Sequence, residues 1–247
     1  DCALWELEAR EQGRPVWSLA GMDAPRPLLT TVTLGADAPE EMAQKALGYG
    51  FAKALKLKLD GNTQADIARV RTVRAARPDV WIGVDPNQGY RPETIADLIP
   101  VLVECDVKLL EQPFRRGHEH EHDGFDSPIP VAADESCLDL AELETLPGRF
   151  DVVNIKLDKC GGLTEGLLMA KRARELGKQV MVGNMCGTSL AAHTEHDATA
   201  RGVAHRVRQE VLYQAAQQVG VAADPGLRGH VVEAQPACLG QDTGLAR

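Results

Sequence analysis

Short apolar runs alternate along the chain with longer stretches whose apolar residues recur at helical spacing. Seven of the short runs are typical of buried strands: residues 30–34, 54–59, 81–85, 107–111, 129–134, 152–157 and 179–183. Amphipathic helices are predicted over residues 3–11, 39–47, 63–76, 92–104, 138–146 and 163–176. Strands that alternate with helices indicate a parallel sheet with crossover helices.

Two architectures fit this alternation, a closed barrel of βα units and an open doubly wound sheet. No GxGxxG or GxxxxGKS/T turn follows the first predicted strands, which disfavours a nucleotide-binding open sheet. Charged residues stand at or near the ends of five successive predicted strands: Lys58, Asp85, Glu111, Asp134 and Lys156. In a barrel the carboxyl ends of all strands surround one mouth, so these groups would converge there. The spacing therefore favours the barrel.

The second predicted strand carries lysines on one face. Because side chains alternate along a strand, Lys56 and Lys58 share a face and the leucines around them share the other. The same alternation puts Asn154, Lys156 and Asp158 on one face of the sixth predicted strand. Parallel strands covered by helices are normally apolar on both faces. Lysines that point into a barrel therefore require compensating charges.

Three of the strand-end residues are carboxylates, which would repel one another at a shared mouth unless a cation lies between them. Asp85, Glu111 and Asp134 form an all-oxygen ligand set that suits Mg²⁺. Lys58 and Lys156 flank them, and a lysine near a cation and away from bulk water is favoured in its neutral, basic form. Two lysines on opposite sides of one carbon indicate a racemase or epimerase. It would move the α-proton beside a carboxylate through an enediolate that the metal stabilises.

Composition restricts the class of protein further. The chain has 247 residues and a formal net charge of −9, which disfavours a role in nucleic-acid binding. No apolar run approaches the roughly 20 residues that a membrane helix needs. The 6 cysteines form no CxxC pair or zinc-ligand cluster, which indicates reduced thiols. No signal peptide opens the sequence, so we expect a cytoplasmic protein that acts on a small molecule.

The strand-end residues lie in motifs that resemble those of a known enzyme superfamily. The motifs are Lys56-Leu57-Lys58, Asp85-Pro86-Asn87, Glu111-Gln112-Pro113, Asp134-Glu135-Ser136, residues 154–162 (NIKLDKCGG) and residues 183–189 (GNMCGTS). In this order they resemble the enolase superfamily, muconate-lactonizing subgroup, and most of all its dipeptide epimerases of the L-Ala-D/L-Glu epimerase type. The resemblance covers residues 3–190 and implies a TIM-type (β/α) barrel.

The resemblance implies an isomerase that uses Mg²⁺ to epimerise a dipeptide or an N-acyl amino acid, from a family whose members are often homo-oligomers. It assigns the flanking lysines and the carboxylates the roles given above. It further implies that Thr33, Lys56 and Asn184 contact the substrate and that Asn87 supports the metal site from beside it.

Other interpretations stay open beside the dipeptide epimerase. Within the same superfamily, the chain could be an N-acylamino acid racemase, or a cycloisomerase or o-succinylbenzoate synthase-like lyase, because relatives with other chemistry keep both lysines. A truncated, catalytically inactive barrel is the alternative from a different class.

The chain departs from the family pattern at both ends. The sequence starts after the position of the family's N-terminal capping domain, and residues 204–211 (AHRVRQEV) lack the Asp-x-Asp expected at the eighth strand. We therefore expect a seven-stranded barrel domain over residues 1–190 and a divergent segment over residues 191–247, helical or abnormal, with a doubtful eighth strand. A diverged tail and a frameshift would both produce this pattern.

Two charged segments are interpreted as solvated surface. Residues 118–123 (HEHEHD) alternate histidines with acids, and we expect a polar loop rather than a metal site because no hydrophobic scaffold would hold the ligands. The arginines of the helix over residues 63–76 and the residue that follows it are expected to form a solvated basic face: Arg69, Arg71, Arg74 and Arg77.

Overall fold

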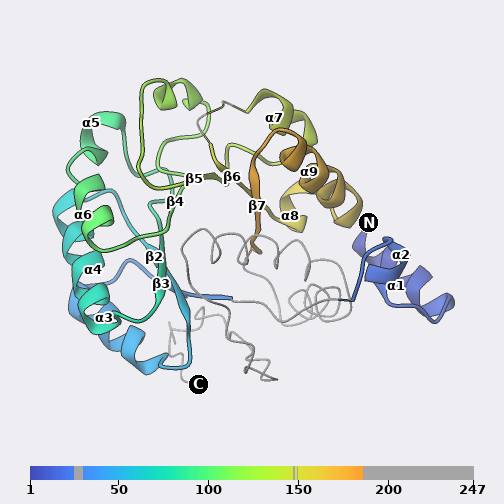
Figure 1. Ribbon diagram of the computed structural model, residues 1–247, viewed down its shortest axis with the longest axis horizontal. Helices are drawn as coiled ribbons and strands as arrows, with labels where there is room; N and C mark the ends of the chain where they lie inside the picture. Colours follow the sequence, from blue (N-terminus) through green and yellow to red (C-terminus); the bar gives the residue numbers. More distant parts are fainter. Residues whose placement is uncertain (25–29, 147, 149, 186–247) are drawn as a thin grey trace, which may run out of the picture.

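The computed structural model describes residues 1–24, 30–146, 148 and 150–185. In this part of the chain, seven parallel strands pair in sequence order. They are β1 (Thr31–Leu34), β2 (Ala54–Lys58), β3 (Trp81–Asp85), β4 (Leu109–Glu111), β5 (Val131–Ala133), β6 (Val152–Ile155) and β7 (Gln179–Val182). The sheet curls, with helices on its outer side (Figure 1). Because a doubly wound sheet reverses its strand order at a switch point, this consecutive order confirms the predicted barrel type.

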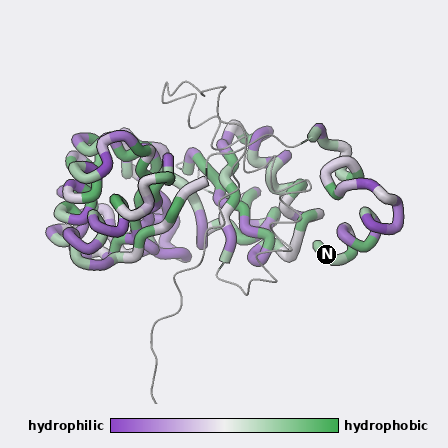
Figure 2. The backbone as a smooth tube through the Cα atoms, turned by 90° about the horizontal axis from the view of Figure 1, so that it is seen from below, coloured by the Kyte–Doolittle hydropathy of each residue, from purple (hydrophilic) through white to green (hydrophobic). Residues whose placement is uncertain are grey.

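Helices connect the strands and precede the first of them. They are α1 (Cys2–Glu11), α2 (Val16–Leu19), α3 (Pro39–Gly48), α4 (Thr63–Ala76), α5 (Pro92–Ile95), α6 (Ile99–Glu104), α7 (Leu140–Thr145), α8 (Leu157–Cys160) and α9 (Leu163–Glu175), with a 3-10 helix η1 (Glu119–His122). Hydrophobic and hydrophilic residues alternate along the outer helices (Figure 2), as expected of helices that bury one face. None of the described helices is long and apolar enough to cross a membrane.

Two predicted elements differ from what the hydrophobic pattern indicated. The helix expected over residues 92–104 is divided into α5 and α6, because Pro100 has no N–H with which to continue the helix from α5. The strand expected over residues 152–157 ends before Lys156, which is the N-cap residue of α8. Asp158 therefore lies on a helix, and the prediction that it shares a strand face with Lys156 is wrong.

The prediction of a solvated basic face on α4 is wrong for two arginines. Arg69 and Arg77 are 7% and 6% exposed. Arg77 donates hydrogen bonds to the carbonyl groups of Ala46, Tyr49 and Ala52, at 2.7–3.0 Å. Arg69 donates to two carbonyl groups in the connection between β1 and α3. Each buried guanidinium thus uses its donors on backbone carbonyl groups of neighbouring segments.

A continuous apolar core lies between the sheet and the helices. It includes strand residues such as Leu55, Ile82 and Leu110, each fully buried. A smaller apolar cluster joins α1 and α2 to α9, and there Trp5 Nε1 donates to Thr164 Oγ1 at 2.9 Å. The helices therefore hold the strands at fixed relative positions, which determines where the strand-end side chains lie.

Candidate active site

The charged residues predicted at the strand ends come together in the structure. Lys58 ends β2 and Asp85 ends β3, and the register of the two strands pairs them directly. Glu111 ends β4, Asp134 follows β5 and Lys156 follows β6. Because the strands are parallel and pair in order, the carboxyl edge of the sheet carries a lysine, three carboxylates and a second lysine in turn.

Each flanking lysine contacts the aspartate on its own side of the site. Lys58 Nζ lies 2.7 Å from Asp85 Oδ2 and 2.6 Å from Asn87 Oδ1. Lys156 Nζ lies 2.6 Å from Asp134 Oδ2. The backbone N–H of Asn87 also donates to Asp85 Oδ1 at 2.9 Å, so Asn87 connects the lysine to the carboxylate. The two ammonium groups therefore reach the carboxylates from opposite sides.

Lys56 occupies a different position from Lys58, although the two lysines share one strand face. Its Nζ lies 2.8 Å from Asp85 Oδ2 and 2.7 Å from Glu111 Oε2. Burial lowers the pKa of Lys56, but the charges of Glu111 and Asp85 outweigh burial and raise the pKa well above its usual value. Lys56 is thus a permanent cation, suited to holding an anionic group rather than to accepting a proton.

Burial makes the carboxylates dependent on nearby cations. Asp85, Glu111 and Asp134 are 0%, 1% and 3% exposed. Burial raises the pKa of both aspartates, but two lysines at each outweigh it and hold the pKa below its usual range. At Glu111 burial and the two neighbouring aspartates prevail over Lys56 and raise the pKa. Glu111 is therefore the carboxylate whose ionised form is least compensated by the nearby lysines.

The donor set fits a divalent cation that prefers oxygen. Carboxylate oxygens come from three successive strand ends, and the raised pKa of Glu111 shows that more positive charge would be stabilising. Asn154 Nδ2 donates to Glu111 Oε1 at 2.8 Å, and the buried Asn154 Oδ1 has no hydrogen-bond partner among the described residues. A bound cation would reduce the repulsion between the carboxylates, and a water molecule on that cation could donate a hydrogen bond to the unpartnered oxygen.

Two residues that support the site were missed by the sequence analysis. Lys159 Nζ lies 2.6 Å from both Oδ1 and the carbonyl oxygen of Asp134. Gln112, fully buried, accepts from the backbone N–H of Asp134 at 2.9 Å and donates to Ser136 Oγ at 2.8 Å. Both residues fix Asp134. The available signal was weak, because a lysine one turn after Lys156 and a glutamine after a strand are both common on protein surfaces.

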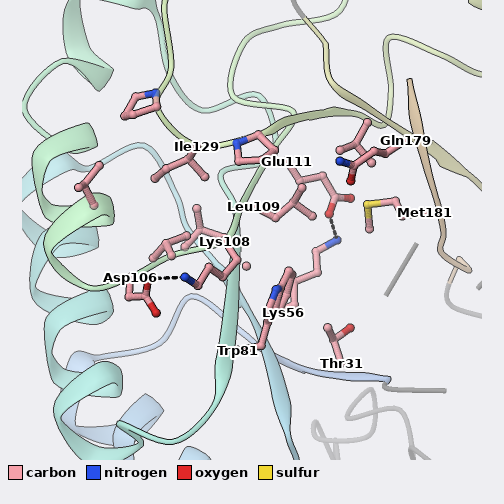
Figure 3. Close-up of a pocket in the computed structure, with 17 residues that line it drawn as sticks. Thr31, Lys56, Trp81, Asp106, Lys108, Leu109, Glu111, Ile129, Gln179 and Met181 are labelled. Atoms are coloured by element: carbon pink, nitrogen blue, oxygen red, sulfur yellow. Dashed lines mark hydrogen bonds and ion pairs between the residues drawn. The ribbon is translucent and has the colours of Figure 1, made fainter. Parts of the chain in front are cut away.

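A cavity of about 340 Å³ lies on the inner side of the sheet. Its walls come mainly from the amino-terminal ends of the strands and include Thr31, Trp81 and Gln179. The ion pair between Lys56 and Glu111 lies at its border (Figure 3). The other charged groups lie at the carboxyl ends of the strands, where active sites of (β/α) barrels are built, so this cavity is not the candidate active site.

The sequence matches the model of one protein family over most of its length. The family is described as enolase C-terminal domain-like, and the match covers residues 38–233. The chain belongs to this family. The resemblance to the enolase superfamily that the motifs indicated is thereby confirmed.

Relatives of the chain within the enolase superfamily are named epimerases and racemases. L-Ala-D/L-Glu epimerase of Escherichia coli is 40% identical over 193 residues, which are 77% of this chain and 60% of that protein. N-acetyl-D-glutamate racemase of Pseudoalteromonas sp. is 37% identical over 194 residues, again 77% of this chain and 60% of that protein. The chain thus spans about 60% of the length of these curated relatives.

Solved structures of the superfamily share the fold. The crystal structure of the dipeptide epimerase from Enterococcus faecalis V583, complexed with Mg and the dipeptide L-Leu-L-Tyr, has a TM-score of 0.75 and 29% identity. That similarity covers 96% of this chain and 67% of the E. faecalis chain. The described strands are therefore those of an enolase-superfamily barrel.

The remaining family positions are only partly placed by the structure. Thr33 on β1 pairs in register with Lys56 and is exposed, so it lies beside the charged cluster. Asn184 follows β7 and is exposed, and its described hydrogen bond goes to the carbonyl of Met185 at 3.4 Å. The role of Asn184 in substrate contact therefore stays a prediction. The predicted boundary at residue 190 and the segment examined for an eighth strand, residues 204–211, lie outside the described residues.

Proposed function

We propose that the chain is the barrel of a Mg²⁺-dependent dipeptide epimerase. Its substrate would be a dipeptide of the L-Ala-D/L-Glu type, and the reaction would invert the α-carbon next to the free carboxylate. Lys58 and Lys156 would act as the acid/base pair, and Mg²⁺ would be held by Asp85, Glu111 and Asp134.

The position of the two lysines carries the proposal. Lys58 ends β2 and Lys156 follows β6, with the carboxylates of the three intervening strand ends between them. Inversion at carbon requires one group that removes the proton from one face and another that returns a proton to the opposite face. An enzyme that only eliminates or cyclises needs one such group, so lysines on both sides favour epimerisation.

The proposed proton transfer uses the lysines in opposite protonation states. The neutral lysine takes the α-proton, and the electron pair of the broken C–H bond spreads into the adjacent carboxylate. The protonated lysine then donates its proton to the other face of the carbon, which restores four bonds with inverted configuration. When bound, Mg²⁺ supplies positive charge that offsets the negative charge accumulating on that carboxylate. Lys56, which stays charged, is placed to hold an anionic group of the substrate.

The proposal is tested by proton NMR in D₂O with L-Ala-L-Glu and Mg²⁺. We expect the α-proton signal of the glutamate residue to disappear while the diastereomer L-Ala-D-Glu accumulates. Lys58→Ala and Lys156→Ala should each lower diastereomer formation by about 100-fold or more, because each removes one of the two proton-transfer groups. Lys171→Ala, which alters a lysine with a 77% exposed side chain, serves as the matched control.

Two further substrates separate the alternatives. L-Leu-L-Tyr tests a hydrophobic dipeptide, and N-acetyl-D-glutamate tests the activity by which the Pseudoalteromonas relative is named. Exchange with N-acetyl-D-glutamate and none with dipeptides would replace the dipeptide proposal. A chain that is folded by circular dichroism and exchanges no α-proton on any of these substrates would be the inactive barrel.

A further inference from the structure

Three side chains that can bind a metal gather in the connection between β4 and β5, apart from the candidate active site. His118, His120 and Glu121 each offer one ligand atom, and these atoms lie within 4.8 Å of one another. His118 Nδ1 and Glu121 Oε1 are 3.3 Å apart, and the rings of His118 and His120 stack with centroids 5.7 Å apart. Both histidines are exposed and Glu121 is half-buried.

The backbone beneath these side chains is anchored, so the premise that no apolar scaffold supports this polar loop is wrong. His122 is 1% exposed, and its ring centroid lies 4.6 Å from that of Phe114 and 4.2 Å from that of Phe150. Glu119 Oε1 accepts hydrogen bonds from the N–H of Gly117 at 2.9 Å and from Ser136 Oγ at 2.8 Å. Residues 119 and 122 therefore fix η1 against the protein. The histidines at 118 and 120 remain exposed to solvent.

The chemistry and the spacing of the cluster suit a transition metal. Two imidazoles and one carboxylate are ligands that Zn²⁺ accepts, whereas Mg²⁺ prefers a set made only of oxygens. With metal–ligand bonds of 2.0–2.1 Å, two ligands of a tetrahedral ion lie about 3.3 Å apart. The distance between His118 Nδ1 and Glu121 Oε1 already has this value. The ligand atom of His120 lies within 4.8 Å of the other two, so a small movement of this exposed side chain would complete the set.

We propose that His118, His120 and Glu121 form a binding site for one Zn²⁺ or a similar divalent transition ion. The fourth coordination position is open to water or to an external ligand. The site is separate from the three-carboxylate site in ligand chemistry and in residues. It is nevertheless connected to it, because Glu119 contacts Ser136, which in turn contacts Gln112.

The test measures Zn²⁺ binding with a chromophoric chelator as competitor, in excess Mg²⁺ to occupy oxygen-ligand sites. We expect the wild-type chain to bind one more equivalent of Zn²⁺ than His118→Ala or His120→Ala. Glu121→Gln should weaken binding at this site by about 10-fold or more, since a carboxylate ligand becomes a neutral amide. Asp123→Asn removes a charge from the same loop outside the ligand group and should leave binding unchanged.

Equal Zn²⁺ stoichiometry and affinity in the wild type and in both histidine variants would overturn the proposal. The replaced histidines are exposed, so the variants should keep the circular dichroism spectrum and melting temperature of the metal-free wild type. The comparison is made between variants of one chain, so ligands elsewhere contribute equally to every measurement. Because binding rather than turnover is measured, the result does not depend on whether the chain epimerises dipeptides.

Discussion

Two lysines of the candidate active site differ in the groups that they contact. Lys56 and Lys58 stand two positions apart on one strand, yet Lys56 bridges two carboxylates while Lys58 contacts one carboxylate and an amide. The charges of Glu111 and Asp85 hold Lys56 as a permanent cation. This difference supports different roles for the two lysines: Lys56 balances charge, and Lys58 is proposed to transfer a proton.

His122 is a second residue whose surroundings determine its properties, and it should make stability depend on pH. Burial lowers the pKa of His122 to about 4, although the acidic residues around it oppose the shift. In the unfolded chain a histidine titrates near 6.5, so between pH 6.5 and pH 4 the unfolded state binds more protons than the folded state. The free energy of unfolding should therefore fall by about 1–3 kcal/mol as pH decreases through this window.

The contribution of His122 is isolated by comparison with His122→Leu. Urea unfolding is measured at pH 7 and pH 4.5, with a chelator present to exclude transition metals. The loss of stability on acidification should be smaller in the variant, because it cannot take up the proton. An identical pH dependence in the two proteins would show that His122 is not the group responsible.

At the scale of elements, the residue after β7 packs closely against side chains at the end of β6 and just beyond it. A Cβ on Gly183 would lie 2.9 Å from Asn154 Oδ1 and 3.0 Å from Lys156 Cε. Asn154 contacts Glu111, and Lys156 contacts Asp134. The residue after β7 must therefore be small if Lys156 and Asn154 are to keep these contacts.

Gly183→Ala should consequently lower the rate of α-proton exchange more than it lowers stability. The new methyl group displaces Lys156, and a misplacement of about 1 Å can cost up to about 100-fold in rate. Exchange in D₂O and urea unfolding are measured on the same samples. Gly48→Ala is the matched control, because nothing lies within 4 Å of the Cβ it would introduce. Equal rates in the wild type and Gly183→Ala would contradict the packing argument.

At the scale of the whole molecule, the carboxylate cluster exists only in the folded chain. Its three members come from strands that are far apart in sequence and adjacent in the sheet. A cation that binds them therefore binds the folded state in preference to the unfolded state. Folding and metal binding are then thermodynamically linked.

Mg²⁺ should accordingly stabilise the wild-type chain. At a concentration 100-fold above its dissociation constant, the free energy of unfolding should rise by about 2.7 kcal/mol. Glu111→Gln should lose most of this gain, because a carboxylate ligand is replaced by an amide. Asp97→Asn, at an exposed position, should keep it. Urea unfolding with and without Mg²⁺ measures the effect, and an equal gain in the wild type and Glu111→Gln would exclude Glu111 as a ligand.

The sequence by itself determined the order of strands and helices and the charges at the strand ends. Both depend on local periodicity and on spacing along the chain, which the amino acids specify directly. The barrel type and the family could be predicted for the same reason. The break between α5 and α6 could also have been predicted, since Pro100 marks it.

Only the tertiary structure decided how the charged residues pair and which of them are buried. Arg77 is buried because it meets carbonyl groups of residues 46, 49 and 52, and His122 because it packs on Phe150. Lys159 supports the site because α8 turns it toward Asp134. Burial and pairing depend on neighbours that are distant in sequence. The hydrophobic pattern of one segment therefore does not predict burial or pairing. Both are decided by contacts between segments of the folded chain.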